Sequence, residues 1–321
     1  MGSDSGRGEM SPDALERLLR ERVDAHRAVA RKGKLATYIP ALGDADPLHL
    51  GVAVCLADGR IVAAGDADVP FTLQSVSKVP ALLLALMDRG PDTVFQHVGM
   101  EPTSEPFDSI LKLELRDPAK PLNPMINAGA IAVTWLVAGE TAEARIARLL
   151  SFVRRLCGND AVAINERVYR SEWETGDRNR ALAYFMRAIG ALPREADVEE
   201  VLAVYFQQCA IEVTCADLAR MGAVLAFDGV APWSGEQLVP REVVRIARAL
   251  MVTCGLYNES GRFAVQAGIP AKSGVSGAVL AAVPKRVGLG VYGPALDDKG
   301  NSVAGLSLLT DLAGVLRLSL F

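Results

Sequence analysis

The stretch Phe71-Thr-Leu-Gln-Ser-Val-Ser-Lys-Val-Pro-Ala-Leu-Leu-Leu-Ala-Leu86 decides how the rest of the chain is interpreted. It is typical of a short extended segment that leads into a buried helix, with Ser75 and Lys78 at the junction. Residues three apart at the start of a helix lie on one face, one turn apart. The lysine amine can then reach the serine hydroxyl and, when unprotonated, accept its proton. This Ser-x-x-Lys pattern predicts a serine nucleophile with a lysine beside it.

A second Ser-x-x-Lys match shows how little the pattern means alone. Ser109-Ile-Leu-Lys112 fits equally well, but an alternating run that ends at Pro118 follows it, so we interpret it as a surface segment. The first match instead precedes Ala81-Leu-Leu-Leu-Ala-Leu-Met87, an apolar helix. A lysine there either extends to solvent or is partly desolvated, which favours its neutral form. The alternative is an ordinary helix start with Ser75 or Ser77 as N-cap.

A further motif, Lys272-Ser273-Gly274, matches the Lys-[Ser/Thr]-Gly element that accompanies Ser-x-x-Lys in enzymes. Glycine allows a backbone to approach a substrate closely, so the Val275 N–H could form an oxyanion hole with the N–H of Ser75. The alternative is a plain Gly-rich edge strand. The third element of the β-lactamase set, Ser-Asp-Asn, is absent from the chain, which argues against β-lactam chemistry.

Composition narrows the class of protein. The 321 residues are 50% hydrophobic and 22% charged with a net charge of −4, which predicts one or two globular domains. Without a basic patch or an apolar run near membrane-spanning length, we expect no nucleic-acid and no membrane partner. The five cysteines are odd in number and lack metal spacing, which favours reduced thiols in a cytoplasmic protein. The three histidines form no zinc-binding pattern, and no Gly-x-Ser-x-Gly elbow occurs.

The predicted elements place strands at both ends of the chain and helices between them. Strands are expected at 50–57 and 60–64, joined by an Asp58-Gly59 turn, and at 262–267, 277–283 and 287–292. A first helix starts at Ser11-Pro12-Asp13, seven more are expected at 75–88, 127–137, 141–156, 178–189, 195–209, 215–227 and 240–253, and Asn301 is expected to cap a last one that runs to about residue 318.

This order predicts an α/β (α+β) fold, with one antiparallel sheet built from both chain ends, packed with helices, and an inserted all-helical domain. Residues 1–10 are expected to be disordered. Residues 11–74 and 254–321 would form a discontinuous sheet domain, and residues 75–253 the helical domain. Ser75 then lies in the cleft between the two domains, where small ligands commonly bind.

Seven motifs follow one another between residues 37 and 277. They are Thr37-Tyr38-Ile39-Pro40, Gln74-Ser75-Val76-Ser77-Lys78, Asn123-Pro-Met-Ile-Asn127-Ala-Gly-Ala130, Ser171-Glu172 with Gly176-Asp-Arg-Asn179, Tyr205-Phe-Gln-Gln-Cys209, Cys254-Gly-Leu-Tyr257, and Pro270-Ala-Lys-Ser-Gly-Val-Ser-Gly277. Together they resemble the serine-dependent glutaminases of bacterial type, which share the β-lactamase/penicillin-binding-protein fold. The resemblance covers most of the chain. One departure is Ala41, where the family usually has a polar or acidic residue after Tyr-Ile-Pro. The contact that holds Tyr38 in place therefore stays open.

The resemblance implies hydrolysis of L-glutamine to L-glutamate and ammonia through a covalent glutamyl-serine intermediate, with no metal and no cofactor. Ser75 is the implied nucleophile, with Lys78 and Tyr257 as its proton-transfer partners. Which of the two is the dominant base stays open, although a charged Lys78 would ease ionisation of Tyr257. The implied partner is L-glutamine alone, and a homo-oligomer, dimer or tetramer, is expected.

The implied glutamine cage suits an amino acid. Besides Ser75 and Tyr257, it consists of Tyr38, Asn127, Glu172, Asn179, Tyr205 and the backbone of Val275. Free glutamine carries an ammonium, a carboxylate and an amide, and all three need partners once desolvated. Glu172 is the anion that matches the ammonium. Taken singly, Glu172 could lie on a solvated helix face, Asn179 could be a helix cap, and Tyr205 could be an aromatic residue of the core. Two other functions stay open on this fold: a β-lactamase or peptidase, and a non-catalytic glutamine sensor.

Overall fold

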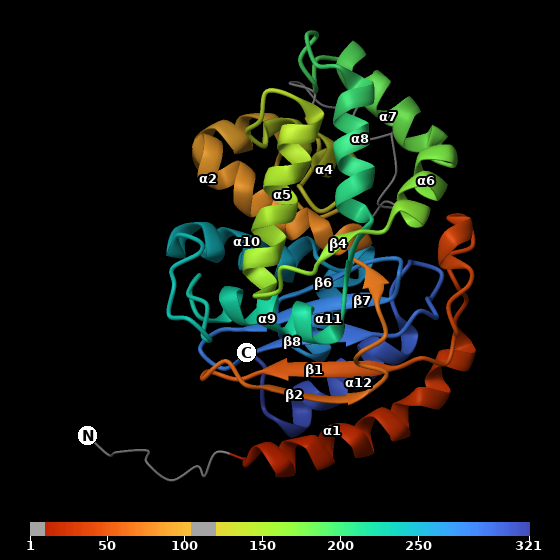
Figure 1. Ribbon diagram of the computed structural model, residues 1–321, viewed down its shortest axis with the longest axis vertical. Helices are drawn as coiled ribbons and strands as arrows, with labels where there is room; N and C mark the ends of the chain where they lie inside the picture. Colours follow the sequence, from red (N-terminus) through yellow and green to blue (C-terminus); the bar gives the residue numbers. More distant parts are fainter. Residues whose placement is uncertain (1–9, 104–119) are drawn as a thin grey trace.

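The computed structural model describes residues 10–103 and 120–321 (Figure 1). The second Ser-x-x-Lys match at 109–112 lies outside the described residues, as do residues 1–9 of the segment predicted to be disordered.

A five-stranded antiparallel sheet forms the base of the molecule, with strand order β2-β1-β8-β7-β6. Its strands are β1 (Gly51–Cys55), β2 (Ile61–Gly65), β6 (Ala271–Ser273), β7 (Ala278–Val283) and β8 (Val287–Tyr292). β1 pairs with β8 in a register that places Ala53 opposite Gly290. The N-terminal hairpin and the C-terminal strands therefore complete one sheet, as predicted from the sequence.

Helices cover both faces of this sheet (Figure 1). Helices α1 (Pro12–Arg27) and α12 (Val303–Val315) pack on one face, and α9 (Cys215–Ala226) packs on the other. Alternate strand residues accordingly enter two cores, with Val52 and Val54 towards α1 and α12, and Ala53 and Cys55 towards α9.

Helix α9 lies unusually close to β8. A Cβ at Gly288 would come within 2.0 Å of the Ala223 backbone nitrogen, so glycine is required there. Because α9 packs on the sheet, it lies with the sheet although it falls within residues 75–253. The division of the chain into a sheet domain and a helical domain stays a proposal.

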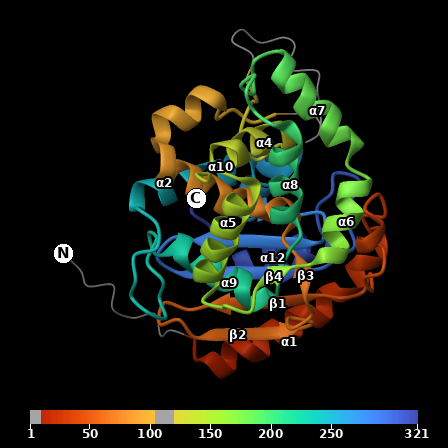
Figure 2. The ribbon, with the colours of Figure 1, turned by 45° about the horizontal axis from the view of Figure 1, so that its top comes forward.

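The other long helices gather above the sheet (Figures 1 and 2). They are α2 (Lys78–His97), α4 (Asn127–Leu136), α5 (Ala142–Cys157), α6 (Glu166–Glu174), α7 (Asp177–Ala188), α8 (Val198–Cys209) and α10 (Arg241–Cys254). A small sheet of β3 (Phe71–Thr72), β5 (Ile211–Val213) and β4 (Ala163–Ile164) joins this layer to the base. Within the described residues, no helix combines the length and apolar composition needed to cross a membrane.

Most predicted helix ends follow from local chemistry. The Ser11 hydroxyl accepts the Ala14 N–H with Pro12 at the first helical position, and Thr141 caps α5 in the same way. The helix predicted at 75–88 begins at Lys78 and continues past Gly90, where a φ of 75° and the following Pro91 interrupt its regular backbone. Helix α6 is not among the predicted helices.

Two predictions near the C-terminus are wrong. Residues 262–267 alternate like a strand, yet Ser260–Gln266 form helix α11, because Phe263 packs inward while Val265 is 89% exposed. Asn301 does not cap the last helix; the Ser302 hydroxyl accepts the Gly305 N–H instead. The Asn301 side chain is therefore available for other contacts.

Candidate active site

A cavity of about 320 Å³ contains most of the predicted site residues. Residues from a 3-10 turn (η3, Gln74–Ser77), from α4, α6, α7 and α8, and from the loop after β6 line it. The predicted residues among them are Tyr38, Ser75, Asn127, Glu172, Asn179, Tyr205 and Val275. Segments that are far apart in the sequence thus meet at one cavity.

Ser75 lies in η3, and Lys78 is the first residue of α2, which follows directly. Ser75 lines the cavity, and Lys78 is only 1% exposed. The Lys78 Nζ donates to the Met125 carbonyl at 3.2 Å and to Asn127 Oδ1 at 2.8 Å. A neutral amine has two N–H donors and one lone pair, so a neutral Lys78 can donate both of these hydrogen bonds.

The Lys-Ser-Gly motif lies directly beside the nucleophile. A Cβ at Gly274 would meet the Leu73 carbonyl oxygen at 2.6 Å and the Ser75 backbone nitrogen at 3.3 Å. Only glycine allows β6 and η3 to approach so closely, which explains why this motif accompanies Ser-x-x-Lys here. Val275, the next residue, lines the same cavity as Ser75.

A buried pair of side chains supports the residue before the nucleophile. Gln74 has a φ of 47°, which a residue with a side chain rarely adopts. Its Nε2 donates to Glu172 Oε2 at 3.2 Å and to Thr72 Oγ1 at 3.4 Å. The Gln74 backbone, strained by its positive φ, is therefore held by contacts that its own side chain makes within the site.

Glu172 is the buried anion of the cavity. Burial raises the pKa of its carboxyl from 4.5 to about 8, although Gln74 and the charge of Lys78 lower it. Without a ligand beside it, a large fraction of Glu172 is therefore protonated at neutral pH. A cation that entered the cavity would restore the charged form.

Tyr257 lies behind Ser75 in a backbone conformation with a φ of 54°. Burial raises the pKa of its phenol well above the usual range, while hydrogen bonding to the Ser75 and Ser273 hydroxyls lowers it. Desolvation outweighs these hydrogen bonds, so the phenol is harder to ionise than an exposed tyrosine. Another lysine lies against its ring, with Lys272 Nζ 4.6 Å from the ring centroid.

Lys272 is itself fully buried. Its Nζ donates to the carbonyls of Gly255 at 3.0 Å and Ser273 at 2.6 Å. Burial, and then the charge of Lys78, hold its pKa well below the ordinary value. Burial and the charge of Lys78 thus favour the neutral amine at Lys272.

Asparagines connect Lys78 to the cavity. Asn127 accepts from Lys78 through Oδ1 and donates from Nδ2 to Asn179 Oδ1 at 3.0 Å. Tyr205 is buried beside them, whereas Tyr38 is 59% exposed and lies at the mouth. Near Tyr38 in the chain, the Ala41 N–H donates to Ser171 Oγ at 3.2 Å.

Sequence reasoning missed some of the residues that line the cavity. They are Ile39, Gln74, Thr175, Gly176, Arg178 and Cys209. Gln74 and Arg178 both stand inside the motifs given above, next to Ser75 and Asn179. Their place beside predicted site residues could have indicated that they line the same cavity. Their roles depend on backbone direction, which a single sequence does not reveal.

Known proteins match this chain over nearly its whole length. The sequence profile of a protein family described as Glutaminase matches residues 33–321. The chain is 56% identical over 299 residues to a glutaminase of Geobacillus thermodenitrificans, covering 93% of this chain and 96% of that protein. It is 50% identical over 307 residues to glutaminase 2 of Clostridium perfringens, covering 96% of this chain and 100% of that protein.

Solved structures resemble the fold equally closely. A Bacillus glutaminase crystallised with 4.3 M NaCl superposes with a TM-score of 0.89 at 44% identity, covering 96% of this chain and 100% of that one. A Bacillus subtilis glutaminase in covalent complex with 5-oxo-L-norleucine, formed by reaction with 6-diazo-5-oxo-L-norleucine, gives 0.87 at 43% identity, with coverage of 96% and 100%. These neighbours confirm the predicted β-lactamase-like fold.

Proposed function

The chain belongs to the glutaminase family, and we propose that Ser75 is the nucleophile with which it hydrolyses the side-chain amide of L-glutamine to L-glutamate and ammonia. The observation that carries this assignment is the position of Lys78, which is 1% exposed and stands three residues after Ser75, a residue that lines the cavity. The reaction of a relative with an electrophilic analogue of glutamine supports a covalent route.

The chemistry is a double displacement. Neutral Lys78 accepts the Ser75 proton as Oγ attacks the amide carbon. The backbone N–H groups of Ser75 and Val275 stabilise the oxyanion, and neutral Tyr257 gives its proton to the departing ammonia. The Tyr257 phenolate then takes a proton back from Lys78, which had accepted it from Ser75. Water then attacks the glutamyl ester, the same groups transfer protons in reverse, and Ser75 is restored.

The cavity orients free glutamine by its charges. Glu172 binds the substrate ammonium, which replaces the proton that burial otherwise holds on this carboxyl. Asn127, Asn179, Tyr205 and Tyr38 are the hydrogen-bonding groups around the carboxylate and amide. Arg178 lines the same cavity and is the cation best placed for the substrate carboxylate.

Ammonia release from purified protein tests this proposal. Glutamine should give ammonia and glutamate in equal amounts. Ser75→Ala should lower kcat at least about a thousandfold, because the loss of one member of a catalytic set that acts as a unit removes most of its effect on the rate. Ser109→Ala, from the second Ser-x-x-Lys match, is the matched control and should retain wild-type kcat. A β-lactamase or peptidase would instead cleave a chromogenic β-lactam or a peptide, and a sensor would bind glutamine without releasing ammonia.

Several broader properties are part of the proposal. We expect the enzyme to need no metal or cofactor, to act in the cytoplasm, to bind no nucleic acid and to form a homo-oligomer, dimer or tetramer. The five cysteines are free and buried, consistent with a reducing compartment. Size-exclusion chromatography with light scattering measures the oligomeric state. Activity after treatment with a chelator tests whether the enzyme needs a metal.

A further inference from the structure

The loop before the first strand places two adjacent side chains in different surroundings. Tyr38 is 59% exposed at the mouth of the substrate cavity, whereas Ile39, the next residue, is only 4% exposed. Ile39 lines the same cavity, just before a 3-10 turn (η2, Pro40–Leu42). The motif Thr37-Tyr-Ile-Pro40 therefore adds an apolar side chain to the site, and the proposed function gives that side chain no role.

Backbone hydrogen bonds hold this loop on both sides of the cavity. Before it, Lys34 and Leu296 exchange two hydrogen bonds, of 2.9 and 2.8 Å. After it, the Ala41 N–H donates to Ser171 Oγ at 3.2 Å. The Ile39 backbone is hydrogen-bonded within the loop through both its N–H and its carbonyl. The Ile39 side chain is therefore a fixed part of the cavity wall.

Ile39 also belongs to the cluster of buried apolar side chains that contains Tyr257. The other buried members of this cluster are Ala36, Val275 and Leu296. Of the two members from the loop, only Ile39 lines the substrate cavity. Tyr257 is 6% exposed, and Lys272 Nζ lies 4.6 Å from the centroid of its ring. Packing in this cluster, together with Lys272, therefore determines where the Tyr257 ring lies.

We propose that Ile39 is a positioning residue, which holds the Tyr257 ring where its phenol can protonate the departing ammonia. The inference rests on the proposed function, in which Tyr257 gives that proton. A general acid must lie within hydrogen-bond reach of the atom that it protonates, and a small displacement lowers the rate steeply. Ile39 transfers no proton itself and acts only through Tyr257.

Two other roles for Ile39 predict a different result. As a substrate contact, Ile39 would help to bind the glutamyl part of the substrate. As a structural residue, it would only keep the protein folded. Either role affects every substrate with the same glutamyl group equally. Positioning of Tyr257 instead matters most when the leaving group needs a proton.

The experiment compares kcat/KM for L-glutamine with kcat/KM for the γ-methyl ester of L-glutamate. Both substrates acylate Ser75 with the same glutamyl group. Ammonia must be protonated as the C–N bond breaks, whereas methoxide can leave with the electron pair of the C–O bond and take its proton from water afterwards. The ratio of the two kcat/KM values therefore measures how much acylation depends on the Tyr257 proton.

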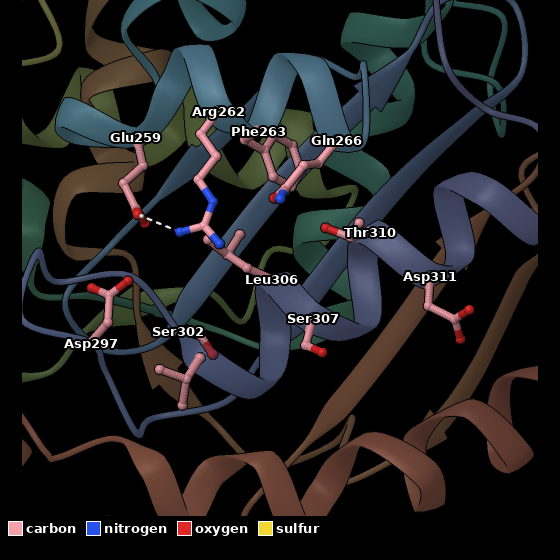
Figure 3. Close-up of a pocket in the computed structure, with 11 residues that line it drawn as sticks. Glu259, Arg262, Phe263, Gln266, Asp297, Ser302, Leu306, Ser307, Thr310 and Asp311 are labelled. Carbon is pink, nitrogen blue, oxygen red and sulfur yellow. Dashed lines mark hydrogen bonds and ion pairs between the residues drawn. The ribbon is translucent and has the colours of Figure 1, made fainter.

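Four variants are compared with wild type, and the melting temperature of each is measured. Ile39→Ala empties part of the Tyr257 cluster, and Ile39→Val removes a single methylene. Tyr257→Phe removes the proton itself. Leu306→Ala is the matched control, because it loses as many carbon atoms as Ile39→Ala but lies in another cavity, of about 590 Å³, between α11 and α12 (Figure 3).

Tyr257→Phe should lower the glutamine-to-ester ratio at least about 100-fold, the usual worth of a general acid. Ile39→Ala should lower the ratio about tenfold and Ile39→Val about threefold, because the space left for the ring grows in that order. Leu306→Ala should keep the wild-type ratio. The positioning role is overturned when Ile39→Ala keeps the wild-type ratio, whether or not both rates fall. Should Ile39→Ala not fold, an unchanged ratio in Ile39→Val overturns it in the same way.

Failure of the proposed function has a different signature. Ser75→Ala that keeps wild-type ammonia release would contradict the role of Ser75. Tyr257→Phe with an unchanged ratio would contradict proton transfer by Tyr257, and the positioning role with it. A lowered ratio in Tyr257→Phe beside an unchanged ratio in Ile39→Ala would contradict only the positioning role.

Discussion

The side-chain amide of Gln74 donates to the carboxylate of Glu172 at 3.2 Å, inside the cavity that Ser75 lines. This contact joins the residue before the nucleophile to the group assigned to the substrate ammonium. We infer that binding of the amino-acid end of glutamine and placement of Ser75 are coupled through these two buried side chains.

Glu172→Gln should raise KM for glutamine about 100-fold, because a buried charged partner of the ammonium is lost. The effect on kcat should be smaller, since the reacting amide lies at the other end of the substrate. Steady-state kinetics measure both constants. Glu174→Gln, an exposed position on the same helix, is the control and should leave KM unchanged. An unchanged KM in Glu172→Gln would remove Glu172 from the binding site.

KM should also depend on pH in wild-type enzyme. The pKa of Glu172 in the substrate-free protein is about 8, so the carboxylate that binds the ammonium becomes more abundant as pH rises. We expect kcat/KM to increase between about pH 6 and about 8, the range in which the Glu172 carboxyl loses its proton. Glu172→Gln should lose this rise. A rise of kcat/KM with pH that persists in Glu172→Gln would be due to the titration of another group.

The same pKa has an opposite effect on the stability of the substrate-free protein. The pKa of Glu172 is raised on folding, so its contribution is fully present below about pH 4.5 and is lost as pH rises through about 8. The melting temperature of wild type should therefore fall relative to that of Glu172→Gln between about pH 4.5 and about 8 and level off above that. Added glutamine should reduce the difference. Parallel melting curves for the two proteins would contradict the raised pKa.

Lys78→Met should separate catalysis from stability. A methionine of similar volume avoids the cost of burying the amine but leaves the Met125 carbonyl and Asn127 Oδ1 without this donor, so the two effects oppose each other and the melting temperature should change little. Activity should nevertheless fall at least about a thousandfold in kcat, because Ser75 loses its proton acceptor. Ammonia release and calorimetry measure the two effects. A variant within about tenfold of wild-type kcat would exclude Lys78 as the base.

Gly274→Ala should damage the site by steric contact alone. Its Cβ would lie 2.6 Å from the Leu73 carbonyl oxygen, a backbone atom that cannot move without shifting η3 and Ser75. Both kcat and melting temperature should fall. Gly314→Ala, in α12 with open space around it, is the control and should stabilise the protein by up to about 1 kcal/mol. Wild-type kcat in Gly274→Ala would show that this close approach is not needed.

The sequence predicted the elements whose signals are local. Asp58-Gly59 indicated the first hairpin, Ser11-Pro12 the first helix, and the strands at both chain ends indicated one shared sheet. The prediction failed where tertiary contacts decide. Phe263 and Val265 alternate like a strand, but a helix packed beside α10 buries one and exposes the other.

The site was predictable as a set of residues and not as a geometry. Ser75 and Lys78 could be placed by helical spacing, and the cage residues only by their order in seven motifs. The places of Gln74 and Arg178 in the cavity depend on segments that meet after folding. The raised pKa of Tyr257 likewise follows from burial, which spacing in the sequence does not reveal.

The central claim is that Ser75 forms the covalent intermediate, and mass spectrometry of the protein treated with 6-diazo-5-oxo-L-norleucine tests it most directly. The account predicts one adduct per chain on the peptide that contains Ser75, protection by excess glutamine, and no adduct in Ser75→Ala. An adduct on another residue, or the same labelling in Ser75→Ala, would contradict it.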